Sequence, residues 1–128
     1  MSERQVVTAD AAPEAAGPYS HAVRHGGVLY CSGQVPIDPE TGEVIEGGPG
    51  EQTTRCLRNL EAVCEAAGTS LQRALMVSVF TTDLASGPEI NEAYAKVLPS
   101  DPPARAMVGV AALPLGVAVE IAAVVAVE

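Results

Sequence analysis

Two opposite charges near the end of the chain are suited to bind a small anion and to move protons. Arg105 follows Pro102-Pro103-Ala104 at the start of an apolar stretch, and Glu120 stands inside the apolar run from Val117 to Glu128. The planar fork of an arginine binds a carboxylate through two parallel hydrogen bonds. A nearby glutamate can position a water molecule and transfer its protons. These two residues are therefore the first candidates for a site.

Side-chain parity places the two charges together if their strands pair. Successive side chains of a strand point to opposite faces, and directly opposed residues of paired strands share a face. In each of the two stretches, bulky aliphatic residues alternate with the charged position. A hairpin turning near 113–116 would join the bulky faces and put Arg105 beside Glu120. The alternative is an ion pair on a solvent-facing sheet surface, which contributes little stability.

Two segments further upstream carry polar groups at a turn and at a strand end. The turn Gly17-Pro18-Tyr19-Ser20 presents a tyrosine hydroxyl. The segment 31–36 ends a strand with Ser32, Gly33 and Gln34, where free backbone amides can meet a ligand. The simpler interpretation of the tyrosine is a turn residue with its hydroxyl in water. The simpler interpretation of the serine and glutamine is that they satisfy backbone groups at the strand end.

Other reactive side chains are interpreted as structural. His21 and His25 flank a predicted hairpin, and we expect both to be exposed rather than catalytic. Lys96 is the single lysine and is expected to face solvent, which gives a Schiff-base mechanism little support. The three cysteines lack the spacing of a zinc site. Cys56 and Cys64 would lie about 12 Å apart along one helix, too far for a disulfide, so buried reduced thiols are expected.

Hydrophobic periodicity and turn residues predict six strands and two helices in the order β-β-β-α-β-α-β-β. Strands are predicted at 5–9, 20–24, 28–34 and 74–82 with a final pair after residue 103, and helices at 51–67 and 86–98. Three local signals support these boundaries: a hairpin at His25-Gly26-Gly27, a helix C-terminus at Gly68 and a capping box of Ser86 with Glu89.

This order predicts an α+β fold that covers residues 1–128 as one domain, with a single mixed β-sheet and two helices packed on one face. The other face of the sheet must be solvated or covered by another subunit. On the last strand that face carries Ala118, Ala122 and Ala126, whose small side chains suit close contact with a neighbouring chain. The pattern predicts self-association.

Composition limits the partners and the location. Apolar residues make up 48% of the chain and aromatic residues only 3%, which predicts an aliphatic core. The net charge of −9 repels phosphate backbones, so we expect no nucleic-acid partner. No apolar stretch reaches the ~20 residues that span a bilayer, so we expect no membrane partner. The start, Met1 to Gln5, has no apolar signal core, which predicts a cytoplasmic protein.

Seven short motifs, in the same order along nearly the whole chain, resemble the RidA/YjgF family of reactive-intermediate (enamine/imine) deaminases. They are Ala16-Gly17-Pro18-Tyr19-Ser20, Ser32-Gly33-Gln34-Val35-Pro36, Glu51-Gln52-Thr53, Asn91-Glu92-Ala93-Tyr94, Pro103-Ala104-Arg105, Leu113-Pro114 and Val119-Glu120-Ile121.

The resemblance implies a chorismate-mutase-like fold and a homotrimer with active sites in the clefts between subunits. It also implies a hydrolase of the 2-iminobutanoate/2-iminopropanoate deaminase type that needs neither a cofactor nor a metal. Such an enzyme converts 2-aminoacrylate and related 2-imino acids to 2-oxo acids and ammonia.

The resemblance further implies roles for individual residues. Arg105 matches the carboxylate-binding arginine of the family, Glu120 is placed to handle the attacking water, and Tyr19 completes the catalytic group. The remaining substrate-binding residues that it implies are Ser32, Gly33, Asn91 and Met107.

The chain departs from the family pattern at several positions. His21 stands where glutamine is frequent, Met107 where cysteine is frequent, and Val97-Leu98 where aromatic residues are frequent. These departures motivate two alternative functions. One is a pathway-specific relative that acts on a larger imine or an aminomuconate-type substrate. The other is a non-catalytic ligand-binding or chaperone-like trimer, in which carboxylate binding alone would preserve Arg105.

Overall fold

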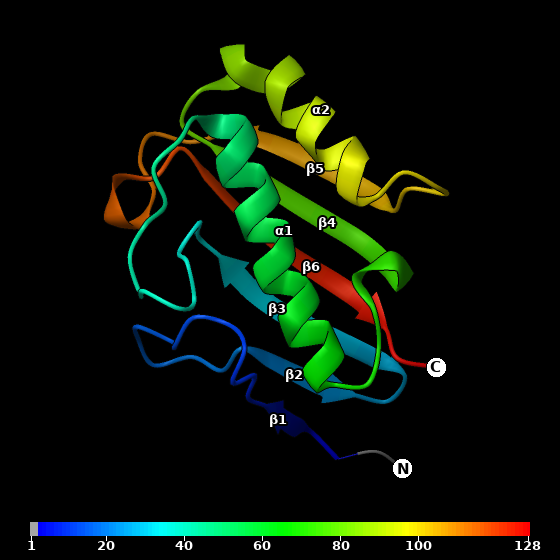
Figure 1. The fold of residues 1–128 in the computed structure, drawn as a ribbon. Helices are drawn as coiled ribbons and strands as arrows, with labels where there is room; N and C mark the ends of the chain where they lie inside the picture. The colour runs from blue at the N-terminus through cyan, green and yellow to red at the C-terminus, as the bar shows by residue number, and fades with distance from the viewer. Residues whose placement is uncertain (1–2) are drawn as a thin grey trace.

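Two helices lie across one face of a mixed sheet in which the strands follow the order β1-β2-β3-β6-β4-β5 (Figure 1). The structure is a computed structural model and describes residues 3–128. The predicted order of elements and the predicted α+β fold are confirmed. The elements are β1 (Gln5–Val7), β2 (Ala22–His25), β3 (Val28–Gln34), α1 (Pro49–Ala66), β4 (Ala74–Thr81), α2 (Gly87–Val97), β5 (Ala104–Gly109) and β6 (Val119–Ala126).

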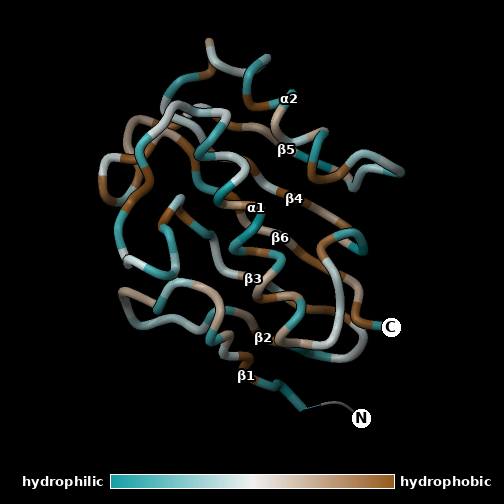
Figure 2. The backbone as a smooth tube through the Cα atoms, in the orientation of Figure 1, coloured by the Kyte–Doolittle hydropathy of each residue, from teal (hydrophilic) through white to brown (hydrophobic). Residues whose placement is uncertain are grey.

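The core between the helices and the sheet is aliphatic, as the composition predicts. Along β6 every second residue is buried, and α1 faces these residues with Leu57, Leu60 and Val63, which have no exposed surface. Each such side chain contributes roughly 1.5–3 kcal/mol by leaving water. Figure 2 shows the same alternation, with hydrophobic residues concentrated in the central strands and alternating with hydrophilic ones along α1. The three cysteines are free and buried, as predicted.

The predicted pairing of the last two strands is wrong. β5 pairs in parallel with β4, and β6 pairs with the other edge of β4 in antiparallel orientation. In this register Arg105 lies opposite Val77, whereas Glu120 lies opposite Phe80. The segment β4-α2-β5 is a strand–helix–strand unit, and such units join parallel strands. The segment 110–118 is therefore a link past the end of β4 and not a tight hairpin.

The two charges also lie on opposite faces of the sheet. Val77 is fully buried beneath the helices, so its neighbour Arg105 points to the helix-covered face. Glu120 alternates with the buried Val119 and Ile121 and so points to the open face. The prediction failed because it joined the bulky faces of both strands. On β5 the bulky Val108 faces the open side, where it is 43% exposed.

The hairpin and the C-terminal cap predicted for α1 are confirmed. His25 pairs with Val28 across a turn in which Gly26 has a positive φ of 61°. Gly68 follows α1 with φ 80°, and its amide donates to the carbonyl of Glu65.

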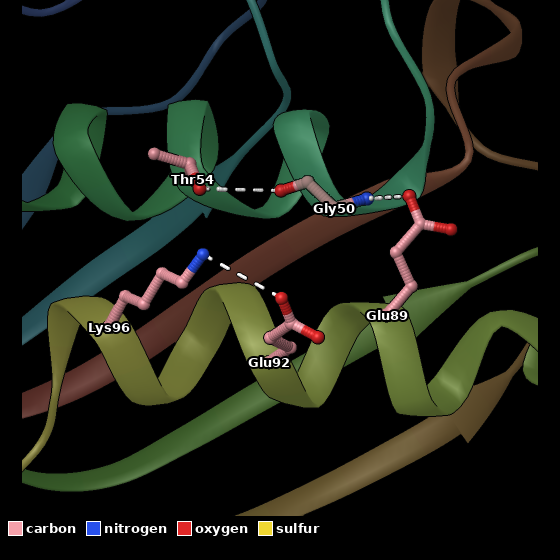
Figure 3. A network of polar contacts seen from close by, with 5 residues as sticks. All are labelled: Gly50, Thr54, Glu89, Glu92 and Lys96. Carbon is pink, nitrogen blue, oxygen red and sulfur yellow. Dashed lines mark hydrogen bonds and ion pairs between the residues drawn. The ribbon is translucent and has the colours of Figure 1, made fainter.

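The predicted capping box of α2 is wrong. The Ser86 hydroxyl bonds Asp83 Oδ2 at 2.7 Å and caps no amide of the helix. Glu89 instead reaches across to the other helix, where its Oε2 accepts a hydrogen bond from the Gly50 amide at 2.9 Å (Figure 3). This contact satisfies a free amide at the start of α1 and ties the two helices together. Lys96 is exposed as predicted, beside Glu92 on the same helix.

The face of the sheet opposite the helices is uncovered and largely apolar. Tyr30, Val108 and Val6 are large apolar side chains on this face with about half of their surface exposed. On β6 the residues of this face are half-buried even without a covering element. An apolar face of this kind matches the predicted contact surface for a neighbouring chain. No helix within residues 3–128 is long and apolar enough to cross a membrane.

The left-handed backbone at Gly68 generates a stability prediction. We expect Gly68→Ala to lower the free energy of unfolding by about 1–2 kcal/mol, because a Cβ at positive φ is strained. Nothing lies within 4 Å of the position that this Cβ would occupy, so the effect isolates backbone strain. Gly87→Ala is the matched control, since its surroundings are equally open and its φ is −49°. Gly87→Ala should raise the free energy of unfolding, measured with urea, by about 0.4–1 kcal/mol. A loss of equal size in both variants would contradict this account.

Candidate functional site

A cavity of about 310 Å³ opens on the uncovered face, where β3 ends and β6 begins. Four of the predicted site residues line it: Tyr19, Ser32, Gly33 and Glu120. They come from the loop before β2, the end of β3 and the start of β6, so segments far apart in the sequence form one site. Arg105, Asn91 and Met107 do not line this cavity.

Glu120 lies directly over the backbone of Gly33. A Cβ on Gly33 would approach the Glu120 carboxyl carbon to 3.0 Å and would collide with its Oε2. The pairing of β3 with β6 shifts register between Cys31 and Gln34, which marks a bulge at this glycine. A side chain at this position would therefore displace the Glu120 carboxylate from its place over the backbone.

Burial of the Glu120 carboxyl raises its pKa above the ordinary value for glutamate. The charged form loses hydration in the cavity, and no arginine of the same chain compensates for this loss. A carboxyl group with a raised pKa exchanges protons more readily near neutral pH than an exposed glutamate does.

Ser32 and Tyr19 place two hydroxyl groups at the same cavity. Ser32 Oγ donates to the carbonyl of Ser20 at 2.6 Å, which leaves its oxygen free to accept a hydrogen bond. Tyr19 is 48% exposed, and its hydroxyl accepts a hydrogen bond from the Ala16 amide at 3.3 Å. The tyrosine proton therefore stays available to a ligand.

The prediction that His21 is exposed is wrong, whereas His25 is exposed as expected. His21 is buried, its Nδ1 accepts from the Ala9 amide at 2.9 Å, and its Nε2 lies 2.7 Å from the carbonyl of Pro13. Because Nδ1 accepts, the proton is on Nε2 and is donated to Pro13. The ring thus fastens the start of the loop that carries Tyr19 and is not a free acid or base.

Arg105 and Met107 lie on the helix-covered side of β5, whereas Asn91 lies on α2. The Arg105 guanidinium carbon lies 4.8 Å from the centre of the Tyr94 ring. Asn91 is exposed on α2, one helical turn before Tyr94, and Met107 is half-buried against the core two residues after Arg105. Burial raises the pKa of Tyr94, and the positive charge of Arg105 opposes part of this rise.

The cavity and Arg105 are too far apart to hold one small molecule within a single chain. β4 lies between β5 and β6, and Arg105 and Glu120 stand opposite Val77 and Phe80 of that strand. Two strand spacings amount to about 10 Å, and three residues along a strand to about another 10 Å. The side chains also project from opposite faces. The structure therefore brings together Tyr19, Ser32, Gly33 and Glu120 but not the arginine half.

Two buried amides brace the cavity, and neither of them was predicted to have a role. Asn59 Nδ2 donates to the carbonyls of Val35 and Ile37, at 3.2 and 3.0 Å, and so holds the cavity wall after β3. Gln52 Oε1 accepts from the Ala118 amide at 2.8 Å and fixes the residue before β6. Both lie on the buried face of α1. The sequence does contain a signal for them, because both amides fall on the apolar face of the predicted helix, and a buried polar group needs a hydrogen-bond partner.

Leu115 and Glu14 also line the cavity without having been predicted. Leu115 is 68% exposed and adopts a left-handed backbone with φ 60°, which is uncommon for a residue with a branched side chain. The turn signal Pro114-Leu115-Gly116 indicated a loop but not that the loop reaches Glu120. Within residues 3–128, no cluster of three or more His, Cys, Asp or Glu side chains could hold a metal ion.

Comparison with known proteins gives consistent results. A sequence model of the family described as Endoribonuclease L-PSP matches residues 9–127. A RutC family protein of Sinorhizobium fredii is 44% identical over 119 residues, which cover 93% of this chain and 94% of that protein.

Solved structures share the fold over almost their full length. RidA from an Antarctic Psychrobacter is 43% identical, with a TM-score of 0.92 and coverage of 95% of this chain and 98% of that one. TdcF of E. coli, solved with bound serine, is 35% identical, with a TM-score of 0.89 and the same coverage.

The raised pKa of Glu120 generates a pH prediction. A carboxyl group whose folded-state pKa exceeds the unfolded value of about 4.3 binds protons more tightly in the folded protein, so stability falls as pH rises through this window. Glu120→Gln removes this loss. In urea unfolding from pH 4 to pH 8, the variant should gain stability relative to wild type as pH rises. The exposed Glu43→Gln variant serves as control, and a wild-type advantage that grows with pH would contradict the assignment.

Proposed function

Because this chain belongs to the Endoribonuclease L-PSP family, in which the RidA/YjgF proteins fall, we propose that it is an enamine/imine deaminase. It would hydrolyse 2-aminoacrylate and related 2-imino acids to 2-oxo acids and ammonia. The observation that carries the proposal is the pair of complementary half-sites. One is a cavity with a half-buried carboxyl group of raised pKa, and the other is an arginine that forms no ion pair within residues 3–128.

We propose that the two half-sites come together between neighbouring subunits of a homotrimer. Arg105 and Glu120 of one chain lie on opposite sides of the sheet, so a complete site needs Arg105 from one subunit and Glu120 from the next. The uncovered apolar face around Tyr30 and Val108 supplies a surface for this association. A closed cyclic assembly satisfies such a head-to-tail contact at every subunit.

The proposed reaction uses orientation and proton transfer. Arg105 of one subunit would bind the substrate carboxylate through two hydrogen bonds. Protonation of the enamine carbon by solvent gives the iminium ion, and water then attacks its carbon while Glu120 accepts a proton from that water. Glu120 gives this proton to the nitrogen of the resulting carbinolamine. The C–N bond then breaks as the hydroxyl proton returns to solvent, and ammonia and the 2-oxo acid leave. Tyr19 and Ser32 would contact the substrate nitrogen or the water, so positioning and acid–base help provide the acceleration.

The second candidate substrate class is larger imines. Met107, two residues after Arg105, stands where cysteine is frequent in the family, and this departure motivates a different substrate side chain. Serine, the ligand bound to the related TdcF, is a small amino acid with a carboxylate, which supports amino-acid-derived ligands for this chain.

RNA cleavage, which the family description suggests, is not the function that we propose. The chain carries sixteen acidic and seven basic residues. Affinity for nucleic acid depends on lysine and arginine neutralising phosphates, and this surface opposes it. The cytoplasmic location of the protein remains a prediction from the sequence.

The direct test couples the protein to a source of 2-aminoacrylate. A dehydratase acting on serine releases the enamine, and the appearance of pyruvate is followed with and without the protein. Wild-type protein should accelerate pyruvate release, and Arg105→Ala should strongly reduce kcat/KM, to a residual rate followed at high protein concentration, because the substrate carboxylate loses its partner. Glu120→Gln should lower turnover more than binding. Lack of acceleration with 2-aminoacrylate and with longer imino acids would refute the deaminase proposal.

The split site has its own test in mixed oligomers. Arg105→Ala and Glu120→Gln subunits, each strongly impaired alone, are unfolded together and refolded at equal concentration. If each site takes its arginine and its glutamate from different subunits, free mixing should restore about one quarter of the wild-type rate. Mixing Arg105→Ala with Arg105→Gln is the control and should restore nothing. Absence of recovery in mixed oligomers, or a monomer near 13.1 kDa in light scattering, would contradict the shared site.

A further inference from the structure

We propose that Tyr94 is a positioning residue for the substrate-binding arginine, which it holds through the face of the guanidinium while leaving the edge free for a carboxylate. The proposal rests on the proposed function of Arg105 and adds a residue on α2 that acts through it. The contact that supports it is the 4.8 Å separation between the guanidinium carbon and the centre of the Tyr94 ring. This distance is well within the ~6 Å over which a ring attracts a cation.

Stacking on an aromatic ring can hold the arginine without occupying its hydrogen-bond donors, which an ion pair cannot do. A guanidinium carries its five N–H donors in one plane, so a carboxylate binds along the edge. A neighbouring glutamate would hold the arginine but would also occupy that edge and neutralise its charge. Within residues 3–128 no carboxylate pairs with Arg105. The aromatic face orients the side chain and leaves its donors and its charge for the substrate.

The ring itself is held rigidly. Tyr94 is only 6% exposed and lies on α2, which covers β5 (Figure 1). Arg105, in contrast, is exposed on the edge strand, and its side chain is long, with many rotatable bonds. Fixing such a side chain in advance lowers the entropy that substrate binding would otherwise lose. A rigid partner beside a flexible one is the arrangement that positioning requires.

The contact with Arg105 distinguishes the ring of Tyr94 from its hydroxyl. Among residues 3–128 the buried hydroxyl has no hydrogen-bond partner, which is unfavourable for stability. The contact with Arg105 uses the ring and not the hydroxyl, so the proposal predicts that phenylalanine can replace tyrosine.

The experiment is a double-mutant cycle on Tyr94 and Arg105, measured in the pyruvate-release assay. Tyr94→Leu should raise KM by about five-fold with a smaller change in kcat, because a mobile arginine weakens carboxylate binding. Tyr94→Phe should keep KM near wild type. In the Arg105→Ala background, Tyr94→Leu should have no further effect on kcat/KM. Val97→Ala, which alters a similarly buried residue one turn later on α2, should leave KM unchanged.

Binding of 2-oxobutanoate, followed by NMR titration, separates this inference from the deaminase proposal. If the protein binds this acid through Arg105 but hydrolyses no imine, the deaminase proposal fails. The double-mutant cycle of Tyr94 and Arg105, measured as the Kd for 2-oxobutanoate, then tests the role of Tyr94. If hydrolysis occurs and Tyr94→Leu leaves KM unchanged, or if its effect persists in Arg105→Ala, the positioning role is refuted. An equal rise of KM in Val97→Ala would also refute it. Absence of both hydrolysis and binding would refute both proposals.

Discussion

The position of β4, paired along both of its edges, is the constraint on which the site depends. β6 occupies one edge and β5 the other, so the two strands that carry the charges are kept apart. The buried side chains Val77 and Val79 anchor this strand beneath the helices, and moving it would expose the aliphatic core. The separation of Arg105 from Glu120 is therefore as stable as the core itself. Under the proposed function, a single chain therefore holds two incomplete half-sites.

Each half-site is built from a flexible functional group and a fixed support. The Glu120 carboxyl lies against a glycine, where a side chain would exclude it, and buried amides on α1 hold the adjacent loops. Arg105 lies against an aromatic ring of α2. In both cases a residue of a helix contacts or positions a group that lies on the sheet: Glu120 on its open face and Arg105 on its edge strand. Under the proposed function, assembly into a trimer would be required for activity, because it joins the two halves.

The distribution of charge is consistent with this division. The Glu120 carboxyl group is half-buried in the cavity, and this burial raises its pKa. In the part of the chain that the structure describes, no carboxylate pairs with the Arg105 guanidinium. Direct contact between the two within one chain would have lowered the pKa of the acid and occupied the donors of the arginine. Keeping them on different faces preserves the reactivity of both.

The sequence by itself determined the order of elements, the α+β fold, the buried cysteines, and a glutamate, glycine, serine and tyrosine that meet at one cavity. Periodicity, turn residues and ordered motifs encode these features locally. Only the tertiary structure decided the strand neighbours, the faces of Arg105 and Glu120, the burial of His21 and the roles of Asn59, Gln52 and Tyr94. Pairing depends on which distant strand occupies each edge, and alternation along one strand cannot report this. The parity of Arg105 and Glu120 was read correctly within each strand, but β4 intervened between them.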